Sequence, residues 1–335
     1  MDRGSFRWPG ASLELPGTAV NALRKLCPRT LRVIRMHSRA PVTGLRRRTI
    51  VDAVKRLPLP VARLGLLVYN RALKTWAPEQ FASTYFGARM RCDPTDLIQR
   101  MILHFGVWEP DVSRVIERNL DAGDVFVDVG ANIGYDSLLA ATRVGSTGRV
   151  VAIEASPRTF DLLQQNLARN AFATNVRAVN VAVSERPGTL DLYEFGAQNI
   201  GAATTLASRG GSLFASAEAL PLQDILMPEE LRRLRLIKMD VEGAEPPILR
   251  NILSRLADYP LTMDILVEAN PEDDMDTWRD VFSQLQASGF SAWAIENEYE
   301  LDWYLRWQRP TPLRRLDAAP DHQQDLLLTR REKPV

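Results

Sequence analysis

The stretch that decides the fold reads Asp-Val-Phe-Val-Asp-Val-Gly-Ala-Asn-Ile-Gly at residues 124–134. Its apolar run ends in Asp128, and a turn with two glycines, Gly130 and Gly134, follows before a helical pattern begins at Tyr135. This order is typical of a buried parallel strand that leads through a tight turn into the start of a helix. Open α/β sheets bind their ligands at such crevices.

A second carboxylate follows the next apolar strand, about 20 residues along the chain. That strand covers residues 149–153, and Glu154 directly after it is suited to accept hydrogen bonds from both hydroxyls of a ribose. In the first turn, Asn132 stands where a dinucleotide fold needs its middle glycine, and Asp128 would repel a pyrophosphate. Asp128 suits a cationic or hydroxyl-bearing ligand instead, and Gly130 leaves room for a close approach. The pattern therefore favours S-adenosylmethionine over a nicotinamide dinucleotide.

A third motif, Leu-Ile-Lys-Met-Asp-Val-Glu-Gly-Ala-Glu at residues 236–245, brings another carboxylate to the same edge of the sheet. Lys238 shares a strand face with Asp240, so it either orients that carboxylate or forms a structural ion pair. Glu242 and Glu245 start a helix, where interaction with the helix dipole explains them as well as catalysis does. We predict Asp240 as the base that accepts a hydroxyl proton, with Glu242 as the second candidate and Lys238 as its support.

Apolar runs and helical periodicity alternate along most of the chain, which predicts an α/β fold with a doubly wound, mostly parallel sheet. We expect strands at residues 84–92, 124–128, 149–153, 176–183, 189–195, 235–240, 261–268, 289–295 and 324–329. We expect helices at residues 96–105, 110–120, 135–143, 157–170, 245–256 and 276–288. Residues 184–223 are least regular, and within them the loop 196–211 is either a substrate lid or a surface connection. Its polar side chains that suit a polyol are Gln198, Asn199, Thr204 and Thr205.

Four ordered motifs resemble the FkbM-type methyltransferase family. They lie at residues 106–110, 128–135, 151–157 and 237–245, and the resemblance covers roughly residues 84–256, with looser agreement to about residue 329. It implies a Rossmann-like class I fold with seven strands, the last of them antiparallel. It also implies O-methylation of a hydroxyl on a sugar, glycan or natural product. The cofactor-binding residues predicted from the motifs are Asp128, Gly130, Asn132, Gly134, Tyr135 and Glu154.

Charge divides the chain into two parts. Residues 1–80 hold 16 Lys and Arg against 4 Asp and Glu, although the whole chain is nearly balanced at 42 against 41. We therefore predict a basic, partly helical N-terminal extension at residues 1–80 and a methyltransferase domain at residues 81–335. Residues 45–76 read as one or two helices broken at Pro58 and Pro60. A packed helical layer is favoured over contact of residues 1–76 with an anionic membrane or an acidic partner.

Several classes of protein are disfavoured by what the sequence contains. The two cysteines and three histidines are too scattered for a disulfide scaffold or a metal cluster, and we predict no metal. If a divalent metal were used, Asp240 and Glu242 would be its ligands. No apolar run reaches the roughly 18 residues of a spanning helix, so we expect a cytoplasmic protein, at most peripheral to a membrane. No nucleic acid is expected, because nothing resembles an Asn-Pro-Pro-Tyr site for a flipped base.

Two other functions stay open beside a methyltransferase with a small-molecule or glycan acceptor. The first is a non-catalytic protein that uses a degenerate methyltransferase fold and binds a membrane or a partner. The intact residues Asp128, Gly130, Gly134, Glu154 and Asp240 argue against this reading. The second is a nicotinamide-dependent dehydrogenase, which the missing middle glycine disfavours.

Overall fold

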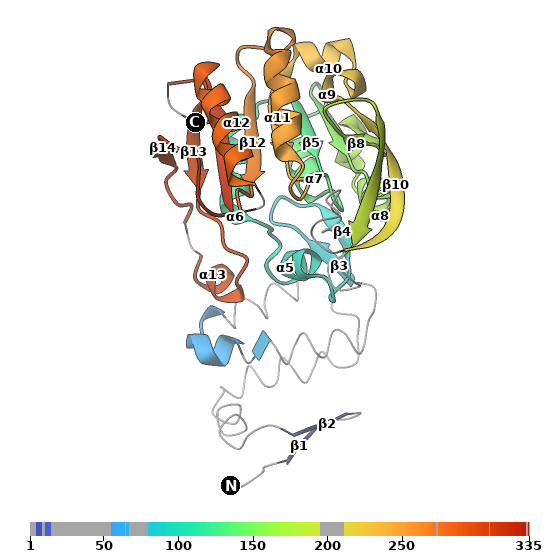
Figure 1. The fold of residues 1–335 in the computed structure, drawn as a ribbon. Helices are drawn as coiled ribbons and strands as arrows, with labels where there is room; N and C mark the ends of the chain where they lie inside the picture. Colours follow the sequence, from blue (N-terminus) through green and yellow to red (C-terminus); the bar gives the residue numbers. More distant parts are fainter. Residues whose placement is uncertain are drawn as a thin grey trace. The chain divides into compact units, whose positions relative to one another are not determined.

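The computed structural model describes residues 5–8, 11–14, 55–63, 65–66, 80–194, 211–272, 274–307, 309–332 and 334 (Figure 1). The chain divides into two compact units, Met1–Trp76 and Ala77–Val335. In the first unit, β1 (Ser5–Trp8) and β2 (Ala11–Glu14) form an antiparallel hairpin. Pro58 lies outside the helical residues 59–63, but Pro60 lies within their first turn, where proline is tolerated. The predicted helix break is therefore found at Pro58 only.

An eight-stranded sheet forms the centre of the second unit, with the strand order β14-β13-β15-β12-β11-β5-β6-β7. The strands are β5 (Val125–Val129), β6 (Arg149–Ile153), β7 (Val176–Val179), β11 (Leu234–Met239), β12 (Asp264–Ala269), β13 (Ser291–Ile295), β14 (Arg314–Leu316) and β15 (Gln324–Thr329). The five strands from β12 to β7 are parallel, and β15 runs antiparallel to β12 and β13. This confirms the doubly wound sheet with an antiparallel last strand, and adds β14 to the seven strands expected.

Helices cover both faces of this sheet. The longer ones are α5 (Leu97–Phe105), α6 (Pro110–Asn119), α7 (Tyr135–Val144), α8 (Pro157–Ala168), α11 (Glu245–Ser254) and α12 (Met275–Ala287). Helices α11 and α12 lie side by side on one face, where their apolar side chains pack on Val127 (Figure 1). Helices α6 and α7 pack on the other face around Phe126. Adjacent residues of β5 thus enter opposite cores, as the alternation of a strand requires.

The strand predicted at residues 84–92 is confirmed only for residues 89–92. The chain forms a hairpin there, with β3 (Gln80–Ser83) antiparallel to β4 (Arg89–Cys92). Thr84 closes the turn, because its N–H donates to the carbonyl of Ala88 at 2.9 Å and its hydroxyl accepts from the N–H of Ala88 at 2.9 Å. Gly87 in the turn has φ +93°, which glycine adopts without strain.

The region after β7 also differs from the prediction. The strand expected at residues 176–183 ends at Val179, and β8 (Ala182–Val183) belongs to a separate sheet with β9 (Gly188–Glu194) and β10 (Ser212–Leu220). Strand β10 lies within residues 184–223, which were expected to be mostly loop, and it pairs with both β8 and β9. The predicted lid residues Gln198, Asn199, Thr204 and Thr205 lie outside the described residues.

Short elements complete the second unit. They are α9 (Leu222–Ile225), α10 (Pro228–Arg232) and α13 (Leu301–Arg306), with the 3₁₀ turns Ala171–Asn175 and Leu256–Asp258. Helices α5 and α13 and the β3–β4 hairpin lie beyond the carboxyl ends of the parallel strands (Figure 1), and share a core with Ile133, Tyr135 and Leu138 of the first turn and helix. They form a wall beside the edge at which the sequence motifs end.

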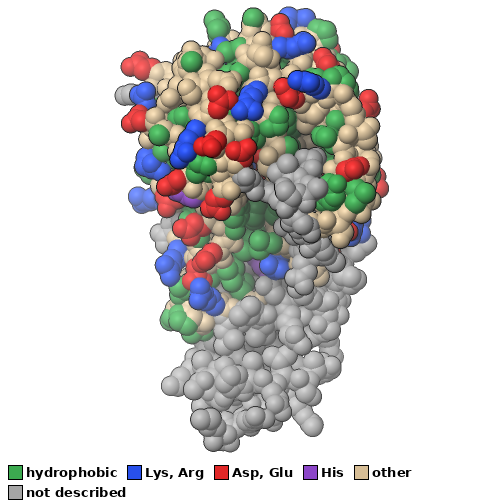
Figure 2. Space-filling view, in the orientation of Figure 1, with side chains coloured by type: hydrophobic (Ala, Val, Ile, Leu, Met, Phe, Trp, Pro, Cys, Tyr) green, Lys and Arg blue, Asp and Glu red, His purple; other side chains and the backbone are tan. Residues whose placement is uncertain are grey.

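Charged side chains are spread over the described surface. On the face shown in Figure 2, Asp and Glu side chains lie among Lys and Arg side chains over the described surface. Within the part of the chain that the structure describes, no helix has both the length and the hydropathy needed to cross a bilayer.

Candidate active site

The turn after β5 is pressed against the backbone that follows β11. The N–H groups of Gly130 and Ala131 both donate to the carbonyl of Ile153 at 2.9 Å. Gly130 has φ +81°, and a Cβ atom there would lie 1.9 Å from the carbonyl oxygen of Asp240. Glycine is therefore required by the contact between two loops. The sequence analysis explained Gly130 by the approach of a cofactor, and this contact gives a second reason for glycine at the position.

Gly134 has a comparable structural reason. It has φ +89°, and a Cβ atom there would lie 2.5 Å from the Cδ1 atom of Leu163 on helix α8. The start of α7 therefore packs closely on α8, which fixes the turn between β5 and α7.

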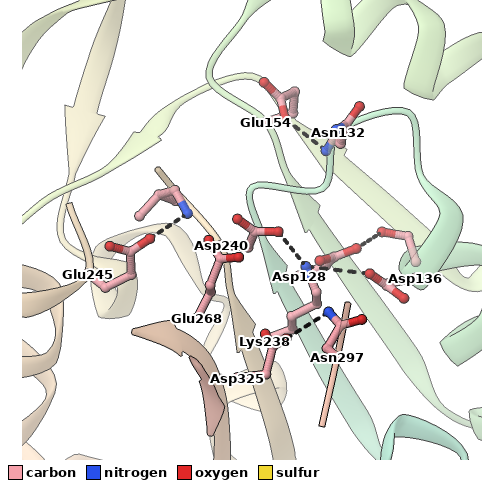
Figure 3. Close-up of polar contacts among 12 residues, drawn as sticks. Asp128, Asn132, Asp136, Glu154, Lys238, Asp240, Glu245, Glu268, Asn297 and Asp325 are labelled. Carbon is pink, nitrogen blue, oxygen red and sulfur yellow. Dashed lines mark hydrogen bonds and ion pairs between the residues drawn. The ribbon is translucent and has the colours of Figure 1, made fainter. Parts of the chain in front are cut away.

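Glu154 holds the same turn from the end of β6. One carboxylate oxygen accepts the N–H of Asn132 at 2.8 Å, and the other accepts the N–H of Ser156 at 2.9 Å (Figure 3). Burial raises the pKa of Glu154 to about 7, although both backbone hydrogen bonds act to lower it. A carboxylate offers about four lone-pair sites, so two remain for ligand hydroxyls. Asn132 itself has φ +49°, in the left-handed region.

Asp128 lies under the turn at the end of β5 and is 1% exposed. One of its oxygens, Oδ2, accepts the hydroxyl of Ser137 at 2.6 Å, while the buried Oδ1 has no hydrogen-bond partner. Burial raises the pKa of Asp128 to about 7, and the nearby ammonium of Lys238 acts against this rise. Buried polar atoms are nearly always paired in native proteins, so an unpaired Oδ1 at a sheet edge fits a ligand donor.

Lys238 joins the cofactor motif to the third motif. It lies beside Asp128 in the pairing of β11 with β5. Its ammonium nitrogen lies 3.1 Å from Asp240 and 3.4 Å from Asp136 on α7, and Figure 3 shows it between these two carboxylates. Burial acts to lower the pKa of Lys238, but the surrounding carboxylates raise it well above its usual value. The side chain of Asp240 remains 30% exposed, so a ligand can reach it.

The two glutamates after Asp240 have different environments. Glu245 is fully buried, and one oxygen accepts the N–H groups of Val241 at 2.9 Å and Gly243 at 3.2 Å. Its carboxylate therefore holds the turn that precedes α11, and no side-chain hydrogen bond caps the start of the helix. Glu242 at the turn's centre is partly exposed and has φ +56°, so the turn presents it in a strained conformation.

Tyr135 is the first residue of α7, and its side chain is used in packing. Its side chain is 4% exposed and packs against Phe86, and its hydroxyl lies 3.2 Å from that of Ser113. The side chain thus anchors α7 to α6 and to the wall of the β3–β4 hairpin.

The structure adds carboxylates that the sequence analysis missed. Glu268 ends β12 and lies opposite Asp325 at the start of β15. Glu268 accepts hydrogen bonds from Tyr299 at 2.7 Å, from the Gln323 amide at 2.6 Å and from the Asn270 amide at 3.0 Å. Asp325 accepts from Asn297 at 2.8 Å, and burial raises its pKa to about 8 (Figure 3).

Part of this edge was detectable in the sequence. Asp128 and Glu154 were identified as carboxylates at the ends of predicted strands. Glu268 ends the predicted strand at residues 261–268, so the same signal would have identified it. Asp325 begins an antiparallel strand, and its position becomes clear only once the direction of β15 is known.

A metal site is not formed by the described residues. Among them, no group of three or more His, Cys, Asp and Glu side chains is arranged to hold a metal ion. Asp240 and Glu242, the ligands considered from the sequence, are not part of such a group.

The fold and the site together define a class of protein. A parallel sheet in this strand order, with one antiparallel strand between β12 and β13, carries a glycine turn after β5 and an acid after β6. This is the class I methyltransferase fold. Residues 128–291 match the model of the methyltransferase FkbM domain, which confirms the resemblance seen in the sequence.

Curated relatives agree with this family. The chain is 30% identical to the methyltransferase sdnD of Sordaria araneosa, over 40% of this chain and 62% of that protein. It is 28% identical to the hexuronic acid methyltransferase AglP of Haloferax volcanii, over 44% of this chain and 58% of that protein. The chain thus spans about three fifths of the length of these two relatives.

Solved structures give weaker similarity. The crystal structure of methyltransferase FkbM from Methylobacillus flagellatus matches with a TM-score of 0.43 and 16% identity, over 69% of this chain and 52% of that chain. Fibrillarin from Aeropyrum pernix, solved with bound S-adenosyl-L-methionine, matches with a TM-score of 0.34 and 13% identity, over 75% and 82%.

Proposed function

We propose that the protein is an S-adenosylmethionine-dependent O-methyltransferase that acts on a hydroxyl of a sugar, glycan or natural product. One observation carries the proposal: the Gly130 turn held by Glu154 lies against the loop that bears Asp240, and Lys238 joins the two. A cofactor half and an acceptor half are thereby brought to one edge of the sheet. We assign the activity to residues 81–335.

The residues of the first half fit this cofactor. Glu154 would accept the ribose hydroxyls with the lone pairs that its backbone partners leave free. The backbone from Gly130 to Gly134 would line the cofactor, and the unpaired oxygen of Asp128 would accept from a donor such as the methionyl end. When bound, S-adenosylmethionine supplies an electrophilic methyl group on a sulfonium sulfur.

The residues of the second half would move a proton. The acceptor hydroxyl must lose its proton as its oxygen gains the methyl group, and Asp240 is the accessible carboxylate placed to take it. Lys238 fixes the Asp240 carboxylate by its ion pair, and Asp136 holds Lys238 from the other side. Glu242 is the second candidate for the base. Alignment of the attacking oxygen would supply much of the remaining rate enhancement.

A hydroxylated acceptor is supported by two observations. The edge beyond Asp240 carries Glu268 and Tyr299, which offer hydrogen-bonding groups rather than an apolar slot. One relative bears the name hexuronic acid methyltransferase, which supports a sugar among the acceptors.

The test is transfer of a deuterium-labelled methyl group from S-adenosylmethionine to a panel of sugars, glycosides and a cell extract, read by mass spectrometry. We expect a labelled ether product with the wild-type protein and at least about 100-fold less with Asp240→Asn. Label on a nitrogen or carbon atom of the product would contradict O-methylation. Binding of cofactor without transfer to any acceptor would instead favour the non-catalytic alternative.

A further inference from the structure

Glu109, directly before helix α6, is a buried carboxylate without a hydrogen bond. The residue is 4% exposed, and no hydrogen bond to its carboxylate comes from any described residue. Burial, together with nearby Asp325, raises its pKa well above the usual value. Burying an unpaired carboxylate costs several kcal/mol, so such a group is rarely kept without a ligand or a function.

The backbone of Glu109 is fixed on several sides. Its N–H donates to the hydroxyl of Tyr304 at 3.0 Å, and its carbonyl accepts the N–H of Ser113 at 2.8 Å. The preceding Trp108 stacks on Tyr299, with ring centroids 5.5 Å apart and planes 17° apart. Glu109 has φ +42°, which is uncommon for a residue other than glycine. The backbone that carries the carboxylate is therefore held in place by the fold.

The charges around Glu109 are mostly negative. Asp325, Asp240 and Asp136 disfavour its ionised form, and Lys238 is the cation that favours it. Lys238 is already engaged by Asp240 and Asp136 in ion pairs. A neutral hydroxyl would leave this excess of negative charge in place, and an anion would be repelled. An ammonium group would offset it and brings three hydrogen-bond donors.

We propose that Glu109 binds a primary ammonium group of a ligand at this edge of the sheet. The inference rests on the proposed function, because methyl transfer brings two ligands that can carry such a group. One source is the amino group at the methionyl end of the cofactor, and the other is an amino group on the acceptor. The charge of Lys238 acts on Glu109, and Lys238 lies between the cofactor turn and Asp240. Both ligands would therefore bind close to Glu109.

Isothermal titration of the full chain distinguishes the two sources. The cofactor pair is S-adenosylhomocysteine, which carries the amino group, and 5′-methylthioadenosine, which lacks the amino acid end. The acceptor pair is glucosamine and glucose, titrated in the presence of saturating S-adenosylhomocysteine. The variant is Glu109→Gln, which keeps the shape and removes the charge, and the matched control is Glu229→Gln at an exposed site.

If Glu109 binds the cofactor, Glu109→Gln should weaken the affinity for S-adenosylhomocysteine by about tenfold or more. The affinity for 5′-methylthioadenosine should stay within about twofold of the wild-type value. For the acceptor source, the wild-type protein should prefer glucosamine to glucose and the variant should lose that preference. Either result supports the proposal. Affinities for all four probes within about twofold of wild type in Glu109→Gln would overturn it.

A second comparison covers the case in which Glu109→Gln does not fold. The wild-type protein is then titrated with S-adenosylhomocysteine and with its analogue that lacks only the amino group, and with the two sugars. Equal affinities within both pairs would overturn the inference while leaving the proposed function intact. If the wild-type protein binds neither S-adenosylhomocysteine nor 5′-methylthioadenosine, the proposed function fails and the inference fails with it.

Discussion

The two halves of the site are built in different ways. The cofactor half comes from one continuous segment, residues 128–154, in which two strands and one helix bring a turn and Glu154 together by local hydrogen bonds. The proposed acceptor half is assembled from four separate parts of the chain, namely Asp240, Glu268, Tyr299 and Asp325. If these assignments hold, a local motif marks the cofactor, while specificity for the acceptor depends on tertiary structure.

The largest effect is expected at Asp240, the proposed base in the methyl-transfer step. Asp240→Asn keeps the shape and removes the basicity, so turnover should fall about 10²–10⁴-fold. Affinity for S-adenosylhomocysteine should change by no more than about threefold, because the cofactor contacts are in the other half. Steady-state kinetics and titration measure the two quantities.

The control for that experiment is Asp276→Asn, whose side chain is 94% exposed and far along the sequence from the motifs. Turnover near the wild-type value in Asp240→Asn would move the role of base to Glu242. Loss of cofactor binding would place Asp240 in the cofactor half, and the division of the site into these two halves would be wrong.

The next effect tests the physical contact between the halves, at Gly130. In Gly130→Ala the new Cβ meets the Asp240 carbonyl in a left-handed backbone, so the free energy of unfolding should fall by more than about 3 kcal/mol. Gly289→Ala is the control, because Gly289 has φ +85°, close to that of Gly130, but nothing within 4 Å of a Cβ atom. It should lose only about 1 kcal/mol, the cost of the backbone conformation. Equal losses in urea unfolding would mean that the loops are not in contact.

Glu245 gives the loop of the acceptor half a dependence on pH. Burial raises the pKa of Glu245 from 4.5 to about 8. The folded protein then keeps a proton that the unfolded chain has released, so this residue makes the free energy of unfolding fall as the pH rises from about 4.5 to 8. Glu245→Gln does not titrate and should remove about 1–3 kcal/mol of that fall between pH 5 and 8. If the free energy of unfolding changes equally with pH in the wild-type protein and in Glu245→Gln, the raised pKa of Glu245 is contradicted.

A smaller effect is expected within the cofactor half, at Glu154. Glu154→Ala removes the acceptor for the ribose hydroxyls, and S-adenosylhomocysteine should bind about tenfold more weakly or worse. Circular dichroism should show an intact fold. Unchanged affinity in a folded variant would refute the role of Glu154 and leave the cofactor half without its defining residue.

The difference between the halves also sets what the sequence could predict. Strands β5, β6 and β11 were predicted within a residue of their observed ends, because each is a buried apolar run that ends in a polar residue. The pairing of Lys238 with Asp240 followed from strand alternation alone. Asp136 was missed, because it meets Lys238 only once α7 packs beside β11.

Irregular segments were predicted less well for a related reason. Strand β10 mixes polar and apolar residues and is partly exposed, so its sequence pattern is weak. Its pairing with β8 and β9 decides its structure. The run 84–92 alternates like a strand, but the hydrogen bonds of Thr84 and the backbone of Gly87 turn it into the end of a hairpin. Glu109 carried no periodic signal, and its importance rests on neighbours far along the chain.

The smallest effect concerns the basic segment outside both halves. Deleting residues 1–44 should leave the affinity for S-adenosylhomocysteine within about twofold of wild type, because every motif and every residue assigned to cofactor binding lies beyond residue 105. Titration of the shortened and full chains measures this. A large loss would show that the basic segment completes the cofactor half.

The account depends most directly on the claim that the Gly130 turn and Glu154 bind S-adenosylmethionine. The measurement is isothermal titration of the full chain with S-adenosylhomocysteine and, separately, with NAD. We predict one site for S-adenosylhomocysteine with a dissociation constant of about 1–100 µM, and no binding of NAD. Binding of NAD in place of S-adenosylhomocysteine, or of neither, would contradict the account.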